Sequence, residues 1–147
     1  IERHELLAGW RALTGVPSPP LEVVEFGNQD FTSPCSEQMI RAVRGARADF
    51  ASGLLFWVKA MEATDRFGPE PYFTTYADAA LCESIQQAEF ARVVDEYSGS
   101  LVPPLPGFVR ELAGWRSGRR MYAEWNDVAV VADLAEAFVL FAWSTSA

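Results

Sequence analysis

The sequence predicts an all-α fold, a compact bundle of about five helices with an extended N-terminal segment over residues 16–32. Apolar residues recur at steps of three and four over long stretches, which is typical of helices that bury one face. Prolines and glycines separate these stretches. The chain has 147 residues, half of them hydrophobic, which suits one core. We therefore expect a single helical domain over residues 1–147.

The first predicted helix covers residues 2–14. Leu6, Trp10 and Leu13 fall on one face of it. The prolines of 16–20 break helical structure and require an extended course. Residues 21–26 are rich in strand-forming types, and we expect an extended segment packed on the helices or one edge strand.

The second predicted helix covers residues 34–65. Ser33 suits the N-cap and Pro34 the first helical position. Its apolar stripe consists of Met39, Val43, Ala46, Phe50, Leu54, Trp57 and Met61. Gly45 and Gly53 lie inside this helix, where each costs about 1 kcal/mol relative to alanine. Close approach of a neighbouring backbone would explain them.

Three further helices complete the predicted bundle. The third follows a variant capping box at Thr75 and ends before Ser98, the fourth covers 106–117, and the fifth covers 119–143. The fifth is apolar on almost every side, so we expect it to be the hub of the bundle or half covered by a second copy of the chain. Its uncharged stretches are shorter than the about 20 residues that a membrane span needs.

The charge of the chain favours some partners over others. The 20 acidic and 12 basic residues give a net charge of -8. Nucleic acids and anionic membrane surfaces need basic contacts, so we expect neither as a partner. A basic protein would be attracted. Arg41, Arg44 and Arg47 step by three along the second predicted helix. A phosphate site there is conceivable, but ion pairing with the acidic excess is the simpler role.

Four carboxylates on the fifth predicted helix are the candidate metal ligands. They are Glu124, Asp127, Asp133 and Glu136. At 100° per residue the first two and the last two lie on opposite sides of a helix, so they cannot all hold one ion. Each pair could supply two oxygen ligands to magnesium. Solvation of a helix face explains the spacing equally well. We expect no cofactor.

The cysteines and the single histidine offer little chemistry. Cys35 and Cys82 belong to no motif, and we interpret them as free thiols in a reducing cytoplasm. No signal peptide is visible at the N-terminus. His4 could pair with a cysteine as a nucleophilic couple, but small buried hydrophobes are the simpler interpretation of both thiols.

The aromatic residues suggest an interface. Five tryptophans exceed what a small core needs, and large aromatics are favoured in binding hot spots. The candidate partner-binding residues are Trp143, Phe56, Trp57 and Phe141. The sequence also contains a P-x-x-P pattern at 103–106, which we interpret as a rigid connector.

The function predicted first is a non-enzymatic, acidic, helical protein-interaction domain. It would act as an adaptor or as an immunity-type neutraliser of a basic partner, and it would self-associate as a homodimer. The alternative is a small magnesium-dependent hydrolase of a phosphorylated substrate that uses helix carboxylates. A pocket for a small apolar ligand between helices is a third possibility.

Overall fold

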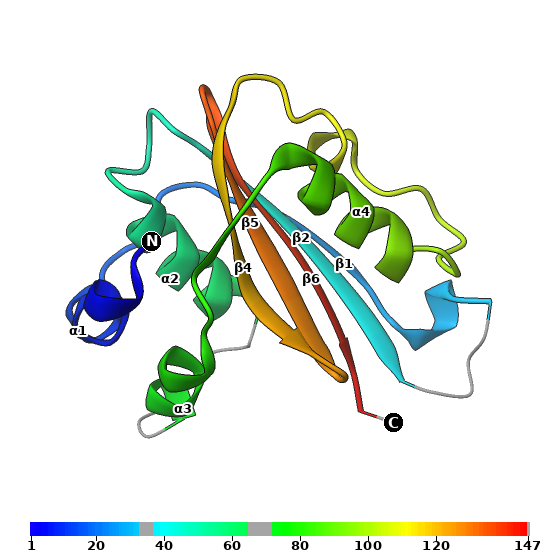
Figure 1. The fold of residues 1–147 in the computed structure, drawn as a ribbon, viewed down its shortest axis with the longest axis horizontal. Helices are drawn as coiled ribbons and strands as arrows, with labels where there is room; N and C mark the ends of the chain where they lie inside the picture. Colours follow the sequence, from blue (N-terminus) through cyan, green and yellow to red (C-terminus); the bar gives the residue numbers. More distant parts are fainter. Residues whose placement is uncertain (33–36, 65–71, 147) are drawn as a thin grey trace.

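A six-stranded antiparallel sheet with helices on both faces forms the protein (Figure 1). The computed structural model describes residues 1–32, 37–64 and 72–146. The predicted all-α bundle of five helices is therefore wrong, because strands occupy the centre of the molecule. The predictions that fail are those for the second to fifth helices, whose segments supply strands β2 to β6.

The elements follow one another in a mixed order. They are α1 (Arg3–Leu13), β1 (Glu22–Phe26), the 3-10 helix η1 (Asn28–Asp30), β2 (Gln38–Ala46), α2 (Gly53–Ala63), α3 (Tyr72–Ala79), β3 (Glu83–Ile85), α4 (Gln87–Tyr97), the 3-10 helix η2 (Gly107–Val109), β4 (Trp115–Glu124), β5 (Asp127–Leu134) and β6 (Ala137–Thr145).

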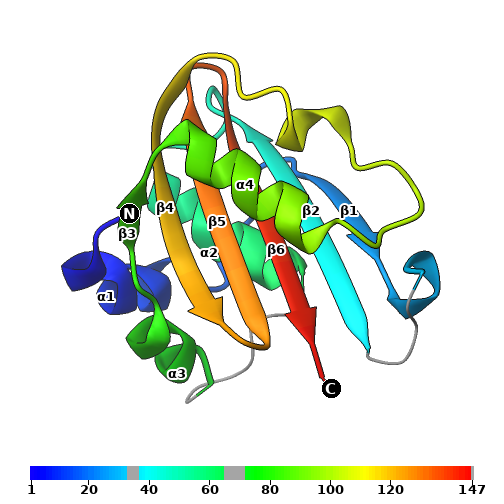
Figure 2. The same cartoon turned by 45° about the vertical axis from the view of Figure 1, so that its right-hand side comes forward.

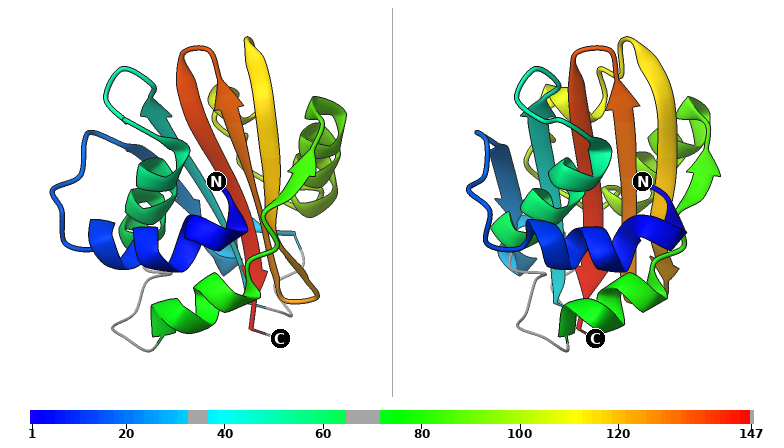
Figure 3. Two further views of the ribbon diagram at one scale, coloured as in Figure 1. Left: turned by 60° about the vertical axis from the view of Figure 1, so that its left-hand side comes forward. Right: turned by 90° about the vertical axis from the view of Figure 1, so that its left-hand side faces the viewer.

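The strand order in the sheet is β1-β2-β6-β5-β4-β3. The last three long strands form a meander, β4 to β5 to β6, with tight turns between them. Helices α1, α2 and α3 lie on one face of the sheet (Figure 3), and α4 lies on the other (Figure 2). The sheet is thus the middle layer of three.

The predicted fifth helix over 119–143 is wrong because both faces of the central strands are covered. Val131 and Leu140 belong to the core cluster beside α1 and α2, whereas Val130 and Phe141 belong to the cluster beside α4. A strand with one wet face alternates apolar and polar residues, but a strand buried on both faces is apolar throughout. Such a stretch cannot be told from a buried helix by periodicity alone.

The predicted second helix over 34–65 is wrong, because its described residues form a strand, a turn and a shorter helix. β2 covers the first part and α2 the second, and Ser52 begins α2 by accepting a hydrogen bond from Leu55 N at 3.1 Å. Ser33 and Pro34 lie outside the described residues. Gly45 lies in β2, where a Cβ would stand 2.5 Å from the Phe50 ring. The close neighbour is therefore an aromatic side chain and not a backbone.

The predictions of a continuous third helix and of a fourth helix are also wrong. The stretch from Thr75 to Tyr97 contains α3, the short strand β3 and α4, and the chain changes direction at Cys82, whose φ is 51°. Residues 106–117 form only the turn η2 and the start of β4. The first predicted helix is confirmed, because α1 forms within 2–14. Of the two alternatives predicted for 21–26, the edge strand is the one that forms, as β1.

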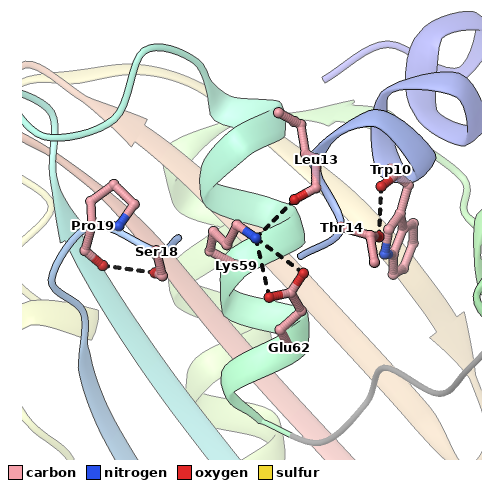
Figure 4. Close-up of polar contacts among 7 residues, drawn as sticks. All are labelled: Trp10, Leu13, Thr14, Ser18, Pro19, Lys59 and Glu62. Atoms are coloured by element: carbon pink, nitrogen blue, oxygen red, sulfur yellow. Dashed lines mark hydrogen bonds and ion pairs between the residues drawn. The ribbon is translucent and has the colours of Figure 1, made fainter. Parts of the chain in front are cut away.

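Lys59, the single lysine of the sequence, joins α1 to α2 (Figure 4). The Lys59 side chain is fully buried, and its ammonium donates to Leu13 O at 2.8 Å and to Glu62 Oε1 and Oε2 at 3.1 and 3.2 Å. Leu13 is the last residue of α1, where carbonyls lack partners within the helix. Lys59 therefore satisfies the end of one helix from the middle of another.

Within the described ranges, no helix combines the length and the apolar character that crossing a membrane requires.

Candidate functional site

A hollow of about 500 Å³ lies between α3 and the end of the sheet where β4 turns into β5. We call it the α3 hollow. Strands β2, β4, β5 and β6 and helix α3 all contribute to it. Its lining residues are Arg41, Thr75, Tyr76, Ala79, Tyr122, Glu124, Asn126, Asp127 and Ser144.

The β4–β5 turn forms the rim of the α3 hollow. Glu124 and Asp127 are Cα partners at the end of the hairpin, and Trp125 and Asn126 connect them. Asn126 O accepts a hydrogen bond from Thr145 N at 3.1 Å, which ties the turn to β6. Trp125 is 73% exposed, more than any other large hydrophobic residue in the described part of the chain. An indole in this position is available to a partner.

Helix α3 forms the opposite wall, and two contacts hold it in place. The Arg3 guanidinium donates to Ala80 O and, at 2.9 Å, to Asp78 O. A cation at the C-terminal end of a helix satisfies unpaired carbonyls and complements the helix dipole. On the inner side, Tyr122 Oη donates to Tyr76 O at 2.9 Å. These contacts join α3 to α1 and to strand β4.

The two sides of the α3 hollow carry opposite charges. Glu124 and Asp127 lie at the β4–β5 side, and Arg41 reaches in from β2. Arg41 Nη1 donates to Ser144 Oγ at 3.4 Å and Nη2 contacts Met39 Sδ at 3.3 Å. Hydroxyl and amide groups line the space between. This lining suits a polar or charged side chain better than an apolar ligand.

Several basic residues outside the α3 hollow form ion pairs with the chain's own carboxylates. The ion pairs are Arg44–Glu22, Arg47–Asp133, Lys59–Glu62, Arg92–Glu96, Arg110–Asp95, Arg119–Glu2 and Arg120–Glu89. The pairs at the surface contribute little to stability, and Lys59–Glu62 differs from them because its ammonium is buried. Each ion pair cancels one positive and one negative charge, so the negative charge of the surface comes from the excess of acidic over basic residues.

The four predicted metal ligands do not come together. Glu124 and Asp127 border the α3 hollow at one end of β5. Asp133 lies at the other end, where it pairs with Arg47, and Glu136 follows in the next turn. No group of three or more His, Cys, Asp or Glu side chains among the described residues is placed to hold a metal ion.

The predicted partner-binding residues have different surroundings. Phe56, Trp57 and Phe141 are fully buried, so a partner that docks on the folded chain does not reach them. Trp143 is half-buried beside Tyr97, with ring centroids 4.9 Å apart. Its Nε1 donates to Gln38 Oε1 at 3.0 Å. Trp143 therefore lies on the α4 face, away from the α3 hollow.

The three predicted arginines do not lie on one face of a helix. Arg41 and Arg44 belong to strand β2, and their side chains point to opposite faces of the sheet. Arg47 follows that strand and pairs with Asp133.

Burial raises the pKa of the Cys82 thiol, which lowers its reactivity at neutral pH. Cys35 lies outside the described residues. His4 is exposed on α1.

Trp125 is a candidate functional residue that the predicted fifth helix leaves out, because a central helix would bury it. One signal was present: Glu-Trp-Asn-Asp at 124–127 interrupts an apolar stretch with turn-forming polar residues. A hairpin turn places its residues outside the sheet, and a tryptophan there is exposed.

Comparisons of this chain with protein-family models, with curated proteins and with solved structures found no match.

Proposed function

We propose that the chain is a non-enzymatic acidic domain that binds a basic protein partner, as an adaptor or an immunity-type neutraliser does. The contact surface is the rim of the α3 hollow. The observation that carries this proposal is Trp125, a tryptophan 73% exposed at the tip of a hairpin. Tryptophan is enriched in binding hot spots, and burial of its large apolar surface against a partner is favourable.

Charge decides the kind of partner. Trp125 stands between Glu124 and Asp127, and these two carboxylates border the hollow beside it. A lysine or arginine of a partner can stack on the indole and approach both carboxylates. The net charge of -8 attracts such a partner from a distance and speeds association. The opposite charge of Arg41 at the far side favours a partner whose basic residue is followed by a polar or acidic group.

The proposal is tested with a display library of random peptides selected on the immobilised chain. We expect enrichment of Arg and Lys beside polar residues. Synthetic versions of the selected peptides are then titrated by calorimetry against Trp125→Ser. Loss of a hot spot weakens binding by roughly 30-fold or more. Val102→Ser is the matched control, since Val102 is also exposed, at 66%, but lies outside the rim.

Two results would overturn the proposal. The first is a set of selected peptides without basic enrichment, or peptides that bind Trp125→Ser and the parent chain equally well. The second is a homodimer, measured by light scattering, that Trp125→Ser converts into a monomer. That result would assign the rim to self-association. The magnesium-hydrolase alternative remains a prediction, and no feature of the α3 hollow favours it over a basic partner.

A further inference from the structure

Strand β1 is an open edge of the sheet (Figure 1). It pairs with β2 on one side, and in the described part of the chain no backbone hydrogen bond joins β1 to any other segment. An edge strand directs alternate N–H and C=O groups outward, which is a template for one more strand. Residues 22–26 contain no proline, and their pairing with β2 runs without a bulge. The opposite edge, β3, has three residues.

The charges beside this edge form two short rows across the sheet. Glu22 is the Cα partner of Arg44, and their side chains pair at 3.5 Å. Glu25 is the Cα partner of Arg41. In each row a basic residue on β2 is therefore followed by an acidic residue on β1. A basic residue on an added strand would continue both rows with alternating sign, and opposite charges on neighbouring strands stabilise their pairing.

We infer that β1 binds an extended basic segment of a protein partner by strand addition. Glu22 and Glu25 are three residues apart and lie on opposite faces of the sheet, so the segment needs two basic residues with two residues between them. The residues between lie opposite Val23, which is 38% exposed, and Val24, and β-branched types suit that position. The expected residue order in the partner segment is therefore basic, β-branched, β-branched, basic.

A second copy of this chain fits the same edge poorly. β1 carries two glutamates and no basic residue, so pairing β1 with β1 extends neither row. It also brings together two chains that each carry a net charge of -8. The same glutamates that discourage self-pairing therefore select a basic strand.

The test uses labelled synthetic peptides with the core Arg-Thr-Val-Arg or Glu-Thr-Val-Glu, measured by fluorescence anisotropy. We expect the basic peptide to bind more tightly by roughly 2- to 30-fold, the product of two cross-strand charge pairs. Hydrogen exchange should slow at amides of 22–26 when it binds. Methylation of alternate peptide nitrogens, on the side that faces β1, should abolish binding. Retained binding by Trp125→Ser separates this edge from the rim of the α3 hollow.

Charge reversal distinguishes recognition from a general effect of net charge. The variant Glu22→Lys/Glu25→Lys should prefer the acidic peptide. The control Asp49→Lys/Glu83→Lys changes the net charge equally at exposed residues outside β1, with Glu83 on the opposite edge of the sheet, and should keep the basic preference. Equal binding of the two peptides, reversal by the control as well, or an absence of protection at 22–26 would each overturn the inference.

Discussion

Lys59 and Glu62 form an ion pair in which only Glu62 is partly exposed. Removal of the Glu62 carboxylate should destabilise the protein more than removal of the Lys59 ammonium. Lys59 is fully buried, whereas the Glu62 side chain is 27% exposed. In Glu62→Ala the ammonium stays in the core with Leu13 O as its remaining described partner, and loss of one partner from a buried pair costs about 3–5 kcal/mol. In Lys59→Met the apolar stem is kept and Glu62 can gain water, so we expect a cost of about 1–3 kcal/mol.

The double variant separates the pair from its surroundings. With both charges removed, no ion is left buried, and Lys59→Met/Glu62→Ala should be about as stable as Lys59→Met alone. Urea unfolding, followed by the fluorescence of the buried Trp10 and Trp57, measures the free energy of unfolding. A cost for Glu62→Ala no greater than that for Lys59→Met, or single costs that add in the double variant, would refute this role of Glu62.

Three other predictions concern packing and titration. Gly45→Ala places a Cβ 2.5 Å from the Phe50 ring and should cost about 1–3 kcal/mol in urea unfolding, whereas Gly53→Ala, whose nearest described atoms lie 3.6 Å away, should not destabilise. The Arg119 hydrogen bond lowers the pKa of Glu2 below its ordinary value of 4.5. The stability that this contact contributes is therefore present above that value and lost as the pH falls below it, so urea midpoints of Glu2→Gln and the parent chain should differ at pH 7 and converge in acid. Burial raises the pKa of the Cys82 thiol, so iodoacetamide should modify Cys82 more slowly in the folded chain than in urea at the same pH, as measured by peptide mass mapping, and equal rates would contradict this.

Several local features could be predicted from the sequence. Leu6 and Trp10 mark the buried face of α1, and the strand-forming residues of 22–26 form β1. Most apolar residues of β5 and β6 within 119–143 are enclosed by their neighbours, as the apolar composition of the segment indicates, whereas the turn at Trp125 is exposed. These predictions depend on residue type and on short-range spacing, which the sequence contains in full.

The tertiary structure alone decided that 119–143 folds as parts of three strands and not as a helix. Layers of helices on both faces of the sheet bury both sides of β5 and β6, and this removes the period of two that identifies a strand. The candidate site depends on the same fact. Trp125 is exposed because it lies in a turn, and Arg41 meets Glu124 and Asp127 around one hollow because β2 and β5 both neighbour β6. Strand order is set by contacts between residues far apart in the chain, which local periodicity does not record.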